Sequence, residues 1–161
     1  MTMQLRDIIL YRDKPYHVGM FTDLLEPYLR PRKIQFFPPN SACWRGYYAR
    51  WEVDQTDKLY LTGLIAVVRL KPYDPQAKYE DDFFGLCETI GLDDLFPGQK
   101  RVFAQWFSGA VRCPFCDADG RVKELELVFQ HGALVHVEEH EGSGEMVFSL
   151  SNKDVNNKVW R

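Results

Sequence analysis

The pattern of apolar side chains between residues 44 and 53 is the clearest structural signal in the chain. Every second residue from Tyr47 to Val53 is aromatic or aliphatic, and the residues between them are mixed in character. Because successive side chains of a strand point to opposite faces, this period of two predicts a strand whose apolar face lies in the core. A polar loop at residues 54–57 precedes the next apolar run, so the two runs together predict a β-hairpin.

Other apolar runs, separated by turn residues, predict further strands and short helical segments. Residues 130–132 form a Gln-His-Gly stretch that is typical of a tight turn. Residues 24–29 and 91–96 predict short helical turns next to prolines, and the rest of residues 71–100 reads as a surface excursion. The predicted strands, besides the one above, are residues 7–11, 16–18, 59–70, 102–111, 122–129, 133–137 and 146–150.

Many short strands without a long helical period favour a mainly β fold, α+β at most. The length of 161 residues suits one hydrophobic core, so we expect a single domain over residues 1–161. We expect a curved antiparallel sheet or partial barrel with one or two short helices. Residues 151–161 are mostly polar and predict a flexible tail.

Composition and charge restrict the partners and the compartment that we expect. Hydrophobic residues make up 45% and aromatic residues 14% of the chain, which is enough for a packed core. A net charge of −3, with 20 basic and 23 acidic residues, predicts no nucleic-acid partner, because such binding needs a clustered basic surface. The apolar runs are shorter than the ~20 residues that cross a membrane, and no secretory signal is evident. We therefore expect a cytoplasmic protein, no membrane partner and reduced thiols.

Cys113 and Cys116 form the sharpest local motif, a pair of thiols two residues apart. Such a pair can chelate zinc or cycle through a disulfide, but redox chemistry needs a helix start that the following turn sequence does not provide. Zinc is the better alternative, with histidines at 131, 136 and 140 downstream. The favoured interpretation is two thiols in a surface turn, so we predict no metal and no cofactor.

The run at residues 138–141 contains three glutamates around His140. Carboxylate oxygens and imidazole nitrogens are metal donors, so this run is an alternative site for a divalent ion. Runs of this kind are more often solvated loops, and we expect a loop here.

The mixed face of the strand at residues 44–53 is the predicted binding surface. Arginines beside flat rings suit carboxylate, phosphate or protein recognition, and these residue types are enriched at interface hot spots. The alternative is that the same rings pack against a second layer of the fold. The candidate ligand- or partner-binding residues are Trp44, Arg45, Tyr48, Arg50 and Trp106.

The chain resembles a group of bacterial proteins that share two strand motifs and have no established activity. The matching motifs are Trp-Arg-Gly-Tyr at residues 44–47 and Phe-Ala-Gln-Trp-Phe-Ser-Gly at residues 103–109. The resemblance extends over roughly residues 7–137, and the chain departs from it by having Asp13 where a turn glycine is expected. It implies a bacterial, cytosolic protein and assigns no catalytic residues.

These observations favour a non-enzymatic domain that binds a ligand or a protein partner. The sequence contains no nucleophile elbow, phosphate-binding loop or dinucleotide fingerprint. Two alternatives stay open. One is a small hydrolase or transferase with a pocket at one end of the sheet, and the other is a binding domain stabilised by zinc at Cys113 and Cys116. Partner identity and oligomeric state are not specified.

Overall fold

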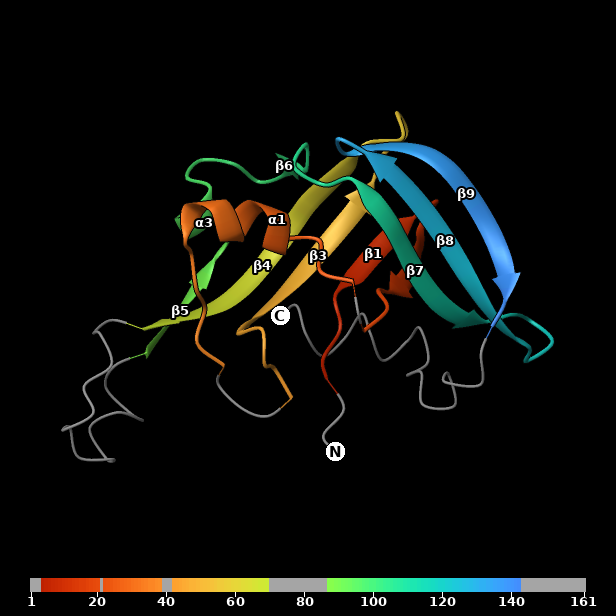
Figure 1. Cartoon of the computed structure of the whole chain (residues 1–161), viewed down its shortest axis with the longest axis horizontal. Helices are drawn as coiled ribbons and strands as arrows, with labels where there is room; N and C mark the ends of the chain where they lie inside the picture. The colour runs from red at the N-terminus through yellow and green to blue at the C-terminus, as the bar shows by residue number, and fades with distance from the viewer. Residues whose placement is uncertain (1–3, 21, 39–41, 70–86, 143–161) are drawn as a thin grey trace.

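Two open sheets and two short helices make up the fold in the computed structural model, which describes residues 4–20, 22–38, 42–69 and 87–142 (Figure 1). The protein is a mainly β single domain with antiparallel strands and short helices, as predicted from the sequence. The sheets do not close into a barrel. The predicted strand at residues 146–150 and the predicted tail at residues 151–161 lie outside the described residues.

The larger sheet has six strands in the order β2-β1-β3-β4-β5, with β6 paired to β4. The predicted hairpin is present as the antiparallel pair of β3 and β4, and β1 likewise pairs antiparallel with β2. In contrast, β1 and β3 run parallel, a long-range pairing that no local pattern indicates. The strands are β1 (Ile8–Tyr11), β2 (Lys14–His17), β3 (Tyr47–Val53), β4 (Leu59–Arg69), β5 (Cys87–Gly91) and β6 (Val102–Phe103).

The alternation predicted for β3 is confirmed, since its residues are alternately buried and half-buried from Tyr47 to Val53. Trp51 is fully buried, and its ring meets that of Trp106 edge to face at 6.4 Å. Burying a large ring contributes on the order of 2–3 kcal/mol, so this face of β3 anchors the core.

Helix α1 (Glu26–Leu29), followed by a 3-10 turn at Arg30–Arg32, and helix α3 (Leu92–Leu95) lie over one face of β3 and β4 (Figure 1). Both predicted helical segments are therefore confirmed. Each is about one turn long, so tertiary packing rather than helix propensity must stabilise them. No helix in the described ranges is long and apolar enough to span a membrane.

The smaller sheet is an antiparallel meander of three strands: β7 (Gly109–Cys116), β8 (Val122–Gln130) and β9 (Ala133–Glu141). His131 and Gly132 both have positive φ, at 47° and 80°, which confirms the predicted tight turn as the two-residue type that suits a twisted hairpin. Leu125, Leu127 and Phe129 of β8 are buried on the core side.

Several predicted boundaries are wrong. The apolar run at residues 102–111 is not one strand. The chain turns after β6, where the amide of Phe107 donates to the carbonyl of Ala104 at 3.1 Å, and a new strand begins at Gly109. Residues 138–141 are not a loop, because β9 stays paired with β8 through Glu141. The strand at Cys87–Gly91 lies inside the region that was read as a surface excursion.

The turn between β8 and β9 joins the two sheets. The amide of Gly132 donates to the carbonyl of Phe107, and its carbonyl accepts from the amide of Leu59, both at 2.8 Å. A Cβ atom on Gly132 would lie 2.7 Å from the carbonyl oxygen of Ala104. Only glycine combines this positive φ with such a close approach.

Replacing Gly132 by alanine should therefore destabilise the protein beyond the ordinary penalty of a positive φ. Gly98 is the matched control, because its φ is +76° and a Cβ there would meet nothing within 4 Å. We expect G98A to lower the free energy of unfolding by about 1 kcal/mol. We expect G132A to lower it by about 2 kcal/mol more, as overpacking does. Urea unfolding of both variants measures the difference, and equal losses would contradict the close approach.

Candidate functional site

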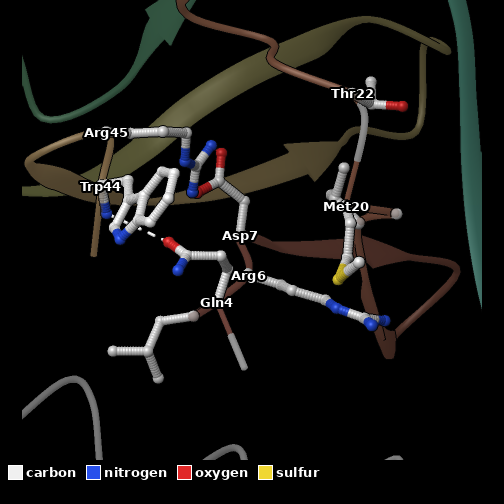
Figure 2. Close-up of a pocket in the computed structure, with 10 residues that line it drawn as sticks. Gln4, Arg6, Asp7, Met20, Thr22, Trp44 and Arg45 are labelled. Atoms are coloured by element: carbon white, nitrogen blue, oxygen red, sulfur yellow. Dashed lines mark hydrogen bonds and ion pairs between the residues drawn. The ribbon is translucent and has the colours of Figure 1, made fainter. Parts of the chain in front are cut away.

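A small pocket lies where the segment before β1 runs beside the turn before β3. The amide of Leu5 donates to the carbonyl of Ala42 at 2.8 Å, and the amide of Trp44 donates to Oε1 of Gln4 at 3.0 Å. These bonds hold residues 4–7 against residues 42–45. The pocket between them has a volume of about 150 Å³, with Trp44 and Arg45 on one side and Met20 and Thr22 on the other (Figure 2).

Exposed apolar side chains form the rim of this pocket. Trp44 is 72% exposed, Met20 53% and Leu5 42%. The described part of the chain has only two other exposed large hydrophobic residues, Val135 and Val137 of β9. Single exposed apolar residues are ordinary, but their gathering around one concavity is typical of an interaction site.

The floor of the pocket carries a buried ion pair. Asp7 is 2% exposed, and its Oδ1 accepts from Nη2 of Arg45 at 2.7 Å and from the amide of Ala49 at 3.1 Å. Its Oδ2 accepts from Nε1 of Trp51 at 2.9 Å. Burial raises the pKa of Asp7, while Arg45 and the N–H donors act to lower it. Such a buried charge is tolerable because Arg45, Ala49 and Trp51 all donate hydrogen bonds to it.

Arg45 extends this network toward helix α1. Burial acts to lower the pKa of Arg45, but Asp7, Tyr47 and Asp23 together raise it above its ordinary value. Nη1 of Arg45 contacts the hydroxyl of Tyr47 at 3.2 Å, and that hydroxyl donates to Oδ1 of Asp23. Burial raises the pKa of Tyr47 well above its ordinary value, so the hydroxyl keeps its proton. The same Asp23 oxygen accepts from the amides that begin helix α1, at 3.1 and 3.0 Å.

Arg6 supplies a second positive charge to the lining and acts on His17 at the end of β2. Burial, and then the charge of Arg6, lowers the pKa of His17. Nε2 of His17 is buried and has no hydrogen-bond partner among the described residues. The neutral imidazole is therefore the form that fits the folded protein.

The structure brings together Trp44 and Arg45 of the five predicted binding residues. Tyr48 and Arg50 lie on the outer, half-buried face of β3, and burial together with Cys43 raises the pKa of Tyr48 to about 12. Trp106 lies on the core side instead, where its ring stacks on Phe96 and its Nε1 donates to the carbonyl of Leu24 at 2.9 Å. The alternative interpretation, in which the ring packs inside the fold, therefore holds for Trp106.

Sequence reasoning missed several pocket residues. These residues, Leu5, Arg6, Asp7 and Met20, come from the start of the chain and from the segment after β2. The residues next to each of them in the sequence form no motif that indicates a binding site. The one available signal was an aspartate directly before a run of aliphatic residues, which is as typical of a strand end as of a buried ion pair.

Cys113 and Cys116 do not converge on a common point. The predicted surface turn is wrong, because both cysteines lie in β7, and residues three apart on a strand face opposite sides. Cys113 is fully buried and Cys116 is exposed. Burial raises the pKa of the Cys113 thiol far above its ordinary value, which disfavours the thiolate that zinc requires.

Comparison with known proteins adds no further information on this site. No protein-family model matches the chain, and no curated protein and no solved structure matches it. A function is therefore inferred from the pocket, its charges and its exposed apolar groups.

Removing the charge of Asp7 should strongly destabilise the fold, because it leaves Arg45 without its buried partner. We expect D7N to lower the free energy of unfolding by about 3 kcal/mol. We expect the double variant D7N/R45M to lose less than the sum of the two single variants, because the stranded charge is then absent. Urea unfolding tests both statements. A D7N protein within about 0.5 kcal/mol of the wild type would contradict this role.

The lowered pKa of His17 predicts a loss of stability in mild acid. The pKa of His17 is lower in the folded protein than the ordinary 6.5, so folding favours the neutral imidazole. This contribution to stability is fully present above pH 6.5 and is lost as the pH falls below 6.5. Between pH 7.5 and 5.5, we expect His17 to lower the free energy of unfolding by up to about 1.4 kcal/mol per pH unit. The H17Q variant should show a flatter profile, and an identical slope in both proteins would refute the assignment.

Proposed function

We propose that this protein is a non-enzymatic binding domain that captures a segment of a protein partner in the pocket between residues 4–7 and Trp44. The observation that carries the proposal is the gathering of exposed Leu5, Met20 and Trp44 around a lining that also contains arginines. Tryptophan and arginine are the residues most enriched at the energetic centres of protein interfaces.

The size of the pocket favours one side chain of a larger partner over a complete small molecule. Small-molecule sites usually enclose about 300–1,000 Å³. The volume here is about 150 Å³, and a cavity of roughly that size holds one benzene-sized group. The rest of the binding surface then has to come from the exposed rim, where Trp44 offers the largest flat area.

The charges of the lining favour an acidic group beside that side chain. Arg6 and Arg45 contribute positive charges and Asp7 a single negative one. Because Arg45 is paired with Asp7, Arg6 supplies the remaining positive charge. The chain as a whole carries −3, so this positive spot is a local feature that attracts a carboxylate. The partner segment therefore combines an apolar or aromatic side chain with a neighbouring acid.

The alternative of a small hydrolase or transferase finds less support at this pocket. Asp7 is the carboxylate of the lining, and both of its oxygens accept hydrogen bonds from Arg45, Ala49 and Trp51. It is thus committed to holding the fold rather than to moving a proton. That the protein is bacterial and cytosolic, and that it binds no nucleic acid, remain predictions from the sequence.

Titration with short peptides tests the proposal by NMR. The probe is Ac-Gly-Phe-Glu-Gly-NH2, and its neutral match carries Gln in place of Glu. We expect shifts of the Trp44 indole and the Gly19 amide, with a Kd on the order of 1 mM for so short a peptide. The acidic peptide should bind about two- to fivefold more tightly, as an exposed ion pair allows.

Two variants separate the apolar from the charged contribution. W44A should weaken both peptides equally, whereas R6Q should abolish the preference for the acidic one. R101Q is the matched control, because Arg101 pairs with Asp54 at 3.4 Å and does not line the pocket. Absence of shifts at the pocket, or a preference that persists in R6Q, would overturn the proposed function.

A further inference from the structure

Strand β9 places three metal-donor side chains on one face. His136, Glu138 and His140 are two residues apart, so their side chains point to the same side of the strand, while Glu139 and Glu141 point to the other. The sequence run at residues 138–141 therefore does not act as one cluster. His136 shares a face with Glu138 and His140 only because the chain is a strand there.

The neighbouring strand adds a fourth donor. In the register of β8 and β9, Glu126 is directly opposite Glu138. Residues directly opposite on antiparallel strands have side chains close enough to interact. The donor atoms of Glu126, Glu138 and His140 all lie within 4.8 Å of one another.

Three of these donors, on Glu126, Glu138 and His140, are close enough together to share one ion, whereas His136 is outside this group and approaches Glu138. Oε2 of Glu138 is 3.2 Å from Nε2 of His136 and 3.7 Å from Nε2 of His140. Nε2 of His140 is 3.8 Å from Oε1 of Glu126. Ligands at 2.0–2.2 Å from a tetrahedral zinc ion are about 3.3 Å apart, so small side-chain rotations bring Glu126, Glu138 and His140 to that spacing.

Arg112 of β7 orients one of the donors. Its Nε lies 3.2 Å from Oε2 of Glu126 and 3.8 Å from Oε1 of Glu124. This pairing occupies one oxygen of Glu126 and leaves Oε1 on the side of His140. Groups that hold a ligating carboxylate in place in this way commonly strengthen metal binding. Three glutamates against one arginine also leave a negative potential that favours a dication.

We propose that Glu126, Glu138 and His140 bind a divalent transition-metal ion of the zinc class on the outer face of the β8–β9 hairpin, with His136 beside Glu138 at the edge of the site. An imidazole nitrogen with carboxylate oxygens is a zinc-type donor set, whereas calcium and magnesium prefer oxygen ligands alone. The site is separate from the pocket and does not depend on the proposed function. It also does not use Cys113 or Cys116.

Calorimetric titration of the chelator-treated, full-length protein with zinc chloride tests the site. We expect one ion per chain, and a Kd that rises at least tenfold in H140A and in E138Q. H136A should weaken binding less than either of these variants, because His136 approaches Glu138 but is not one of the three clustered donors. Cobalt(II) added in place of zinc should give visible absorption bands of a site without thiolate-to-metal charge transfer.

Matched controls lie on the same strand and on β7. E139Q and E141Q remove the same charge from the opposite face of β9 and should leave zinc affinity within about twofold of the wild type. C113S/C116S should also bind normally. Equal loss in E139Q and E138Q would indicate nonspecific charge attraction and overturn the site, as would an absence of zinc binding. Circular dichroism of each variant confirms that the hairpin still folds.

Discussion

The buried carboxylate of Asp7 is the constraint on which much of the structure depends. A charge with 2% exposure must be satisfied by donors, and these come from Arg45, Ala49 and Trp51, more than thirty residues later in the chain. Satisfying it fixes β1 beside β3 in the parallel orientation, although every other strand pair is antiparallel among the described residues. The backbone carbonyl of Asp7 also accepts from the amide of Val18, so the end of β2 is held by the same residue.

The pocket is a consequence of this network rather than an addition to it. Asp7 and Tyr47 hold the guanidinium of Arg45 inward, and the adjacent Trp44 is then left 72% exposed at the rim. The hydroxyl of Tyr47 in turn donates to Asp23, whose oxygen accepts from the first amides of helix α1. Stability and the proposed recognition thus share residues, so the charged floor cannot change freely while the exposed rim can. Specificity for a partner would evolve most easily at the rim.

Local patterns predicted the parts of the fold that local geometry determines. The period of two in β3 and the Gln-His-Gly turn before β9 were read correctly, because side-chain alternation and positive φ leave direct traces in the sequence. The ion pair of Asp7 with Arg45 left no such trace, since it depends on two segments 38 residues apart. The same limit explains Trp106, whose ring looked available for binding but fills the space between Phe96 and Trp51. Most of the candidate pocket therefore appeared only with the fold, since Trp44 and Arg45 are the two lining residues that the sequence pointed to.

The run at residues 138–141 shows how strand geometry changes the chemistry of an unchanged sequence. Taken as a loop, it is a set of like charges that solvent separates. Taken as the end of β9, it divides into two faces, and only one of them meets Glu126 of β8. The hairpin is pinned to the larger sheet at its turn by Gly132. An ion bound between Glu126 and Glu138 would cross-link the two strands away from that turn, on the side of the hairpin where β9 is the sheet edge. Edge strands are the least restrained parts of a sheet, so a cross-link stabilises most where backbone pairing is available on one side alone.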